Sequence, residues 1–593
     1  MVFALTLFLS VLLFFSIAVD LASADPAVPY AVKITGIEDS ALLANLKDVS
    51  DSLALIDRPP PSLGLLRARA ERDRDRFTRL LHSRGYFGAG VKIALREDVE
   101  PLELIFSVDP GPAYAVSSIQ IRITGEEEVH PHLIPSPEKI GLSPGRPFSA
   151  STLIDAEKTL VRTFEQQGFP FPRLDDRKII VDHREPSVAL ELFIDPGLRA
   201  PFGDVKIMGL ESVEESVVRR VIPWKEGELF DVEKVEALQM GLIRLGLFSS
   251  VRVLRDAELD EKGRLPLVIS VTERKHRSIG AGVSYKTDEG PGATVLWEHR
   301  NLFREGERLT LSGTASSFTA SAESVFFKPF FFRRDQSLRL LLRVAEDRPD
   351  PYTSRNATAS ASVARHLTEQ LRVSAGVGYR TSRVEQLGVT ESFSYFFLPL
   401  DVEWDRSDDL LDPSRGGRFG LYLVPFYDPS GKDPKFVKSR IRYRHYLKPF
   451  SAYPLVLATA LSIGSITGAE RDEIPADERF YAGGGGSIRG YAFQSVGPFR
   501  DGAPVGGRSL LEAAVEARLK FTERLGLVAF LDGGNAYEAR FPDFAETLRW
   551  GTGLGFRYFT PVGPLRLDVA FPLNRRPEID DRIQIYVSLG QAF

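Results

Sequence analysis

In the second half of the chain, apolar residues alternate with polar or small ones at every second position. In 338–344, leucine and valine occupy the even positions and arginine occupies 339 and 343. The same period of two recurs in 371–380, 550–558, 565–571 and 583–593. Side chains with this period lie on opposite faces of a β-strand. The pattern predicts about 16 antiparallel strands with one apolar face, from about residue 276 to 593.

The apolar face of this sheet could contact lipid or could form the core of a soluble β-domain. The other face carries many arginines and glycines, which suits a water-filled lumen. Charged stretches at 344–356 and 466–480 interrupt the pattern and are expected to form exposed loops. We therefore expect a transmembrane β-barrel at 276–593, and a soluble β-domain is the alternative.

Composition is compatible with a barrel but not with a bundle of membrane helices. The chain of 593 residues is 43% hydrophobic, with a mean hydropathy of −0.10. After residue 24 it has no apolar run of about 18 residues, the length of a spanning helix. A net charge of −5 does not predict binding to nucleic acid or to an anionic membrane surface. Cysteine is absent, so disulfides play no part.

The first 24 residues differ from the rest of the chain. Val2 to Val19 are almost wholly apolar, and the small residues Ala22 and Ala24 follow. This arrangement is typical of a signal peptide, although no Lys or Arg precedes the apolar run. We expect 1–24 to be a cleaved signal peptide. A transmembrane anchor is the alternative, because the run is about long enough to span a bilayer.

A module of about 80 residues is repeated three times before the barrel segment. Each copy has a short β-pattern, helical sequence, a glycine followed within two residues by an aromatic, and two more β-patterns. The glycines after the first β-pattern and after the helices are Gly36 and Gly85, Gly125 and Gly168, and Gly209 and Gly246. A glycine after a helix suits a left-handed cap. The predicted fold is three tandem α+β modules with the order β-α-α-β-β, at 25–110, 111–198 and 199–275.

These modules resemble POTRA domains, the periplasmic modules of outer-membrane assembly proteins. The segment "VDPGPAY", Val108 to Tyr114, is similar to the link between one POTRA module and the next. The resemblance implies that an exposed strand edge can pair with an unfolded client or a partner by β-augmentation. A rigid periplasmic spacer is the alternative role, and the sequence favours neither.

A glycine-rich stretch, "YAGGGGSIRGYAFQSVGP", begins at Tyr481. It lacks the Gly-Lys-Ser/Thr sequence of a phosphate-binding loop, and no strand-to-helix pattern surrounds it. "SIRGY" resembles the (V/I)RG(Y/F) motif in the sixth extracellular loop of the same outer-membrane superfamily, which folds back into the barrel lumen. The loop glycines Gly483, Gly484, Gly485 and Gly486 would let the backbone pass close to the barrel wall.

Arg489 of this motif needs carboxylate partners if it lies inside the barrel. Alternation in two neighbouring strands places Glu516, Phe530 and Asp532 on the lumenal face. The superfamily carries a glutamate and an "F.DxG" aspartate in these strands, which match Glu516 and Asp532. We predict that Arg489 pairs with both carboxylates, because a planar guanidinium can bind two acceptors at once. The predicted loop lock consists of Arg489, Gly490, Tyr491, Glu516, Phe530 and Asp532.

A second stretch, "RNLFREG" from Arg300, is similar to the superfamily pattern "RNLFGxG". Arg304 stands where glycine is usual. We expect the stretch to be structural, with a departure from the pattern at its turn.

The number of modules favours one branch of the superfamily. BamA, the general barrel-insertion factor, carries five POTRA modules, two-partner secretion transporters carry two, and this chain has room for three. The chain therefore resembles the TamA branch, the outer-membrane subunit of the translocation and assembly module. The resemblance implies a TamB-like partner anchored in the inner membrane, autotransporter and other outer-membrane protein clients, and contact with outer-membrane lipid. A two-partner-secretion pore and a BamA-like assembly factor are the alternatives.

The implied mechanism is not enzymatic. The first and last strands, about 277–286 and 582–593, would form a lateral seam that opens toward a client strand. The residues expected to weaken or mark this seam are Gly280, Gly282, Gly590 and Phe593. The sequence has no G-x-S-x-G motif, no H-E-x-x-H motif and no histidine cluster, so we expect no fused lipase, metal site or cofactor. A passive pore and a structural tether are further alternatives.

Overall fold

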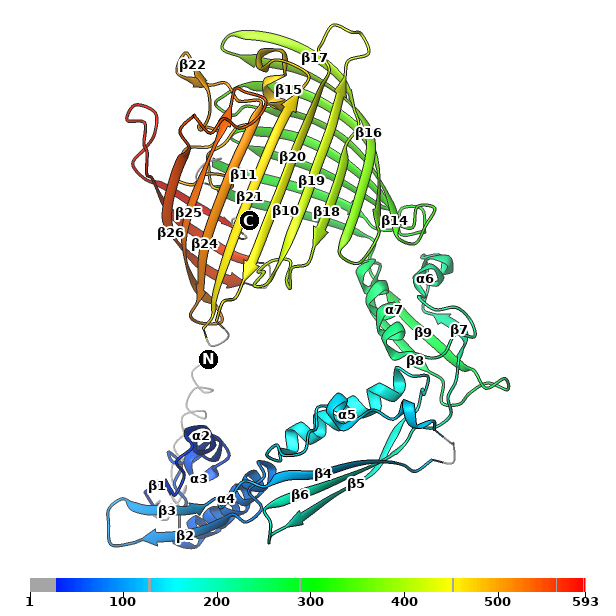
Figure 1. Ribbon diagram of the computed structural model, residues 1–593, viewed down its shortest axis with the longest axis vertical. Coiled ribbons are helices and arrows are strands. Elements are labelled where there is room, and N and C mark those ends of the chain that lie inside the picture. Colours follow the sequence, from blue (N-terminus) through cyan, green and yellow to red (C-terminus); the bar gives the residue numbers. More distant parts are fainter. Residues whose placement is uncertain are drawn as a thin grey trace, which may run out of the picture. The chain divides into compact units, whose positions relative to one another are not determined.

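The computed structural model describes residues 28–593 except 126–128, 287–289, 451–452, 561–562, 590 and 592–593 (Figure 1). The predicted signal peptide lies outside the described residues. Within them, no helix has the length and apolar character needed to cross a bilayer. Three small three-stranded sheets precede one large antiparallel sheet, which confirms the predicted fold class.

The first module packs its helices against one sheet. Its elements are β1 (Tyr30–Thr35), α2 (Ser40–Asp48), α3 (Asp51–Ala54), α4 (Leu63–Ser83), β2 (Gly90–Arg96) and β3 (Leu102–Asp109). The strands lie in the order β1-β3-β2, with β1 parallel and β2 antiparallel to β3. One face of α4 buries Leu66, Phe77 and Leu81. Phe77 meets Phe106 of β3 edge to face, with 4.9 Å between the ring centroids.

The second module has the same sheet order but a shorter first helical region. Its elements are β4 (Ala115–Ile123), the 3-10 turns η1 (Pro131–Leu133) and η2 (Pro137–Ile140), α5 (Ala150–Glu165), β5 (Arg173–Asp182) and β6 (Ser187–Asp195). Its strand order is β4-β6-β5. Pro131, Pro135 and Pro137 lack a backbone N–H, so this region forms single turns where the repeat pattern predicts a helix.

The third module returns to the full pattern. Its elements are β7 (Phe202–Met208), α6 (Glu215–Val221), α7 (Val232–Arg244), β8 (Phe248–Arg255) and β9 (Leu265–Glu273), in the sheet order β7-β9-β8. The glycine after the last helix has a positive φ in every module, as a left-handed cap requires: 88° at Gly85, 104° at Gly168 and 70° at Gly246. We propose that the modules end near residues 110, 198 and 275, just after β3, β6 and β9.

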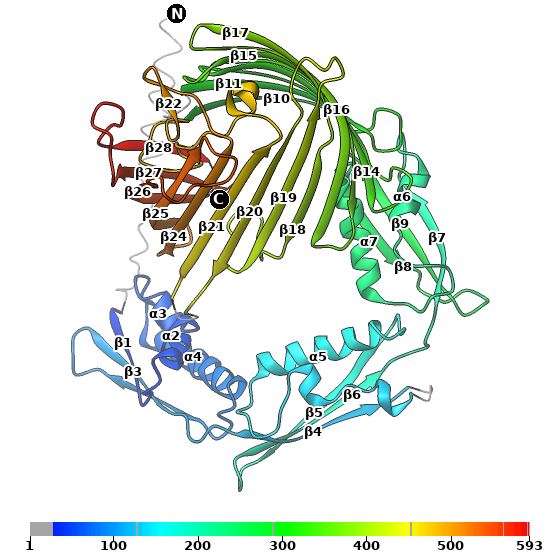
Figure 2. The same cartoon turned by 45° about the horizontal axis from the view of Figure 1, so that its top comes forward.

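The large sheet forms a barrel, seen in Figures 1 and 2. Its strands are β10 (Arg277–Lys286), β11 (Gly290–His299), β12 (Arg308–Ser316), β13 (Thr319–Lys328), β14 (Gln336–Asp347), β15 (Thr353–His366), β16 (Leu371–Gln386), β17 (Val389–Phe397), β18 (Leu400–Asp405), β19 (Gly416–Tyr427), β20 (Phe436–Leu447), β21 (Leu455–Thr467), β24 (Ser509–Lys520), β25 (Leu525–Tyr537), β26 (Arg549–Thr560), β27 (Gly563–Pro572) and β28 (Gln584–Leu589). All hydrogen-bonded strand pairs of this sheet are antiparallel.

Two of these 17 segments are halves of one strand. Both β17 and β18 lie between β16 and β19. Gly378 pairs with Phe397 and Ala375 pairs with Leu400, so one register runs through both segments. The break falls at Pro399, which has no N–H to donate to the ladder. The barrel wall therefore consists of 16 strands, as the sequence predicts.

The two faces of the sheet differ in polarity. Val515, Leu527 and Leu554 lie on the outer face and are 50%, 50% and 66% exposed. The opposite positions, such as Glu516 and Asp532, are buried inside the barrel. Apolar side chains exposed around a whole wall suit contact with lipid and not with water.

The seam between β10 and β28 has the fewest backbone pairings of the wall among the residues that the structure describes. β10 and β28 come together, but no hydrogen-bonded ladder joins them in the part of the chain that the structure describes. β28 pairs with β27 only from Leu565 to Ala570. Of the predicted seam glycines, Gly280 and Gly282 lie in β10, and a side chain at Gly282 would meet no neighbour within 4 Å. Gly590 and Phe593 lie outside the described residues.

The turn between β11 and β12 contacts the loop that follows β7. Arg304 has a φ of 75°, the left-handed conformation for which glycine is the usual residue. Its carbonyl oxygen accepts from the backbone N–H of Glu214 at 2.9 Å, and its Nε donates to the carbonyl oxygen of Ser212 at 3.1 Å. Asn301 donates to the same oxygen at 3.3 Å. Arginine is strained in this backbone conformation, but its side chain makes the hydrogen bond to Ser212 that a glycine cannot make.

Glu273, the last residue of β9, holds the same loop from its other side. Its carboxylate accepts from the backbone N–H groups of Glu211, Ser212 and Val213 at 2.8–2.9 Å and from Ser212 Oγ at 2.6 Å. Burial raises the pKa of Glu273, but these four hydrogen bonds outweigh it and lower the pKa to about 2. The loop therefore depends on the ionised carboxylate.

We expect this loop to loosen in acid. Because the folded pKa lies below the usual value, Glu273 stabilises the loop fully above about pH 5 and loses this effect as the pH falls toward 2, for a total of about 2–3 kcal/mol. Hydrogen exchange of the amides at 211–213 should therefore speed up between pH 5 and pH 3 beyond the intrinsic rate. In Glu273→Gln, exchange should be fast already at pH 7 and should show no such step. A step that persists in this variant would contradict the assignment.

Candidate functional site

A long loop between β21 and β24 enters the barrel. It runs from 468 to 508 and contains the 3-10 turns η3 (Arg471–Glu473) and η4 (Ala476–Glu478) and the short pair β22 (Phe499–Arg500) and β23 (Ala503–Pro504). In Figures 1 and 2, β22 lies at the end of the barrel where β15 and β17 also lie. This end of the wall is opposite to the end at which the chain enters β10. Three sets of contacts anchor the loop inside the wall.

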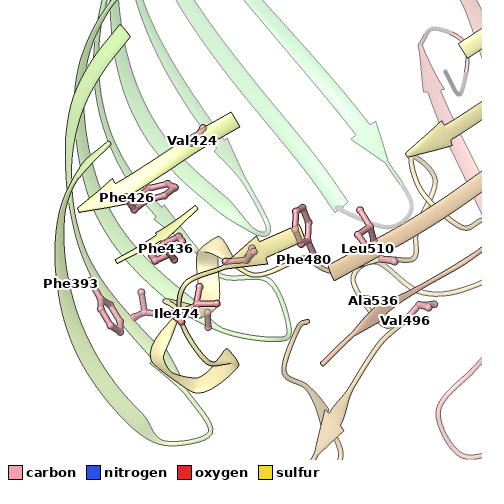
Figure 3. Close-up of a cluster of buried hydrophobic side chains, with 14 of the residues drawn as sticks. Phe393, Val424, Phe426, Phe436, Ile474, Phe480, Val496, Leu510 and Ala536 are labelled. Carbon is pink, nitrogen blue, oxygen red and sulfur yellow. The ribbon is translucent and has the colours of Figure 1, made fainter. Parts of the chain in front are cut away.

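The first anchor is an apolar cluster. Loop residues Ile474, Phe480 and Val496 are at most 5% exposed. Figure 3 shows these side chains together with others from the inner wall. The wall residues labelled there are Phe393, Val424, Phe426, Phe436, Leu510 and Ala536. The rings of Phe426 and Phe436 stack at 4.5 Å. Burying a large apolar side chain contributes about 1.5–3 kcal/mol, so this cluster holds the outer part of the loop strongly.

The second anchor is ionic and lies at η4. Arg380 of β16 pairs with Asp477 and, through Nη1, with Glu478 at 3.0 Å. Lys438 of β20 donates to Glu478 at 3.1 Å, and Ser354 of β15 donates to Asp477 at 2.6 Å. The turn is thus tied to three strands of the wall.

The third anchor is Arg489, which is 1% exposed. Its Nε and Nη2 donate to the two oxygens of Asp532 at 2.6 and 2.8 Å, a bidentate pair. Its Nη1 donates to Glu516 at 2.7 Å and to Asp568 at 3.1 Å. The guanidinium carbon lies 3.5 Å from the centre of the Phe530 ring. One side chain therefore joins the loop to three adjacent or nearby strands, β24, β25 and β27.

Three more arginines lie beside the carboxylates that Arg489 binds. Arg518 donates to Glu516 at 2.7 Å, Arg557 pairs with Asp568, and Arg566 lies 3.5 Å from Asp568. Asp532 has only Arg489 as an ion-pair partner among the described residues. Loss of one partner from a buried pair costs about 3–5 kcal/mol, because the other charge is left uncompensated.

Glycines on both the loop and the wall allow this close approach. Gly483, Gly484 and Gly490 have φ values of 100–103°, so another residue would be strained at each position. A side chain at Gly551 of β26 would overlap the carbonyl oxygen of Arg489. Gly485 and Gly486 have no positive φ, and Arg566 donates to the carbonyl oxygen of Gly485 at 2.9 Å.

The residues after Arg489 are fixed by hydrogen bonds. The backbone N–H of Gly490 donates to the Tyr586 hydroxyl at 3.1 Å, and that hydroxyl donates to the carbonyl oxygen of Tyr491 at 2.8 Å. The Tyr491 hydroxyl donates to Asn574 at 2.7 Å. Tyr491 is therefore buried among β26, β28 and the loop after β27 and not against the guanidinium.

The structure brings together Arg489, Glu516, Phe530 and Asp532 as the sequence suggests. Sequence reasoning missed Asp568, Gly551 and Tyr586. Asp568 and Gly551 both alternate with the apolar residues of their strands, so the sequence predicts that they face the lumen. Alternation does not predict which lumenal residues the loop contacts.

The chain has a barrel of 16 strands with an apolar outer face and an anchored loop inside it, and small α+β modules precede the barrel. This architecture is that of an outer-membrane barrel protein. The Omp85 superfamily domain matches residues 301–593, and the surface antigen variable number repeat, a POTRA model, matches 200–274. The chain belongs to the Omp85 superfamily. Its barrel lies in the outer membrane and its POTRA modules lie in the periplasm.

Similar proteins of established name agree with this family. The outer membrane protein assembly factor BamA of Nitratidesulfovibrio vulgaris is 26% identical over 95% of this chain and 73% of its own length. BamA of Neisseria meningitidis serogroup B is 22% identical over 88% of this chain and 72% of its own length. A crystal structure of BamA from Haemophilus ducreyi lacking POTRA domains 1–3 has a TM-score of 0.64 at 18% identity, covering 81% of this chain and all of that one. This likeness supports the fold.

Proposed function

We propose that this protein is a non-enzymatic insertase that helps other outer-membrane proteins to fold into the membrane through its seam. The proposal rests on the difference in backbone pairing between the seam and the rest of the wall. Neighbouring strands elsewhere share ladders of up to 14 residue pairs, as β15 and β16 do. β28 shares six with β27, and among the described residues it shares none with β10. An unpaired strand edge is a template for an incoming client strand.

The anchored loop favours an insertase over a passive secretion pore, the alternative function. Arg489, the η4 pair and the apolar cluster anchor the loop to the inner wall, and we expect the anchored loop to block a steady aqueous path through the lumen. In this proposal the anchored loop closes the route through the lumen, and clients use the lateral route between β10 and β28.

Within the superfamily, three modules favour a TamA-like role over that of a BamA-like general factor. In this role the modules bind a TamB-like protein of the inner membrane, and the clients include autotransporters. The exposed edges of the module sheets are the surfaces that would pair with such partners.

Reconstitution tests the proposal. The full chain in liposomes should speed the folding of a urea-denatured outer-membrane barrel client by at least about ten-fold relative to liposomes that hold an unrelated closed barrel. Folding is followed by the heat-sensitive shift in gel mobility, and ion conductance is recorded on the same vesicles. Absence of acceleration together with a steady conductance would support the pore instead.

A further inference from the structure

The outer face of the barrel has an apolar groove over β11 to β16. Its volume is about 890 Å³, within the range of small-ligand sites. The floor consists of small residues from three strands, β12, β13 and β15, and the rim consists of large residues. The floor residues are Gly313, Ala322, Ser324, Ala357 and Ala359, and the rim residues are Val295, Trp297, Leu311, Leu342, Val344 and Tyr379.

Strand register explains why the groove is continuous. Gly313 pairs with Ala322, Ala322 with Val344, and Val344 with Ala357, so three small residues lie at one height on the two sides of Val344. Two residues nearer the start of β14, Leu342 pairs with Ala359, and Ala359 pairs with Tyr379. Large side chains thus stand beside positions that have almost no side chain, and they leave a hollow that faces lipid.

A charged hollow of about 630 Å³ continues the groove toward the outer end of the strands. It shares Val344 and Ala357 with the apolar groove and is bounded by Arg355 and Arg383. These two arginines are exposed, face outward and lie directly opposite each other in the ladder. Like charges at opposed positions destabilise a strand pair unless a counter-charge is present.

Protein carboxylates supply only part of this counter-charge. Glu346 accepts from Arg355 at 2.8 Å and lies 3.5 Å from Arg348 of the neighbouring loop. Arg383 has no ion-pair partner among the described residues, and Glu385 lies one outward-facing position farther from the groove. Arg348 and Arg355 therefore share Glu346, while Arg383 has no paired carboxylate among the described residues; Arg355 and Arg383 lie directly above an apolar surface.

We propose that the groove and these arginines form a binding site for a lipid of the outer leaflet with a phosphorylated head and several acyl chains. The acyl chains lie in the apolar groove, and the phosphate accepts hydrogen bonds from Arg355 and Arg383. The outer leaflet follows from the topology, because Arg355 and Arg383 lie at the end of the wall opposite to the one at which the chain enters β10 from the periplasmic third module. The proposal depends on this orientation and not on the insertase function.

Binding to the full chain in detergent micelles tests the site. The probe is lipid A, which carries two phosphates and several acyl chains, and phosphatidylglycerol and phosphatidylethanolamine are compared with it by native mass spectrometry. Arg355→Gln with Arg383→Gln should weaken lipid A binding by at least about ten-fold. Ala357→Phe, which fills the floor of the groove, should weaken it by a similar factor.

Matched variants elsewhere on the surface serve as controls. Arg540→Gln changes an exposed loop arginine, and Ala513→Phe enlarges an outward-facing alanine of β24; neither should change lipid A binding. The arginine double variant lies beyond the apolar band, so it remains informative if Ala357→Phe fails to fold. Equal binding of phosphatidylglycerol and lipid A, or binding that neither test variant weakens, would overturn the proposal.

Discussion

Replacing Arg489 with alanine is expected to release the loop from the lumen and to lower the free energy of unfolding by about 3–5 kcal/mol. The change leaves Glu516, Asp532 and Asp568 with one cation fewer, and Asp532 with none. Arg489→Lys should recover only part of the loss, because an ammonium group cannot bind Asp532 in two places and reach Glu516 as well. Urea unfolding in micelles measures the stability, and single-channel recording should show a larger conductance.

Two matched variants separate the role of the charge from that of the loop. Arg500→Ala removes an exposed arginine of the same loop that pairs with Asp472 at 3.1 Å, and it should change stability by less than about 1 kcal/mol. Gly551→Ala keeps all charges but pushes against the carbonyl oxygen of Arg489, so it should also raise conductance. Unchanged conductance and stability in Arg489→Ala would show that the other two anchors hold the loop alone.

The second large effect is expected at the seam. A disulfide between a cysteine in β10, placed between Gly280 and Val283, and one in β28 should abolish client folding, because the edge can no longer open. Reduction of the disulfide should restore activity in the same sample. The chain contains no cysteine of its own, so each introduced pair is the only one present.

A second disulfide elsewhere in the wall provides the control. Val515 and Leu531 lie directly opposite each other in the β24–β25 ladder, and opposed residues of antiparallel strands are close enough for a disulfide. Val515→Cys with Leu531→Cys should therefore cross-link without loss of activity. Full activity with a fully cross-linked seam would exclude lateral opening.

Local alternation was sufficient to predict much of the barrel and part of its site. The parity of β24 and β25 alone places Glu516 and Asp532 in the lumen, and the bounds of β10 agree with the predicted first strand. The same reasoning did not identify Asp568 as a partner of Arg489. Which strands surround a lumenal group depends on the stagger and tilt of the closed barrel, and a single sequence does not contain these values in any local pattern.

The modules show a similar limit. Repeat spacing predicts three copies of one unit, and the glycines Gly85, Gly168 and Gly246 take the expected left-handed caps. The spacing does not predict that prolines shorten the first helical region of the second copy, although Pro131, Pro135 and Pro137 are visible in the sequence. The repeat pattern predicts the elements that all three modules share, but it does not predict how the prolines of one module alter its helical region.

The interruption at Pro399 has a mechanical consequence. Counted from β10, the interrupted strand is the eighth of 16, so it stands half-way around the wall from β28 and β10. A cylinder that parts along one line must bend most on its far side. At this position Pro399 has no backbone N–H, so the strand has one hydrogen bond fewer that bending would distort. Pro399 is therefore suited to act as a hinge when β10 and β28 move apart.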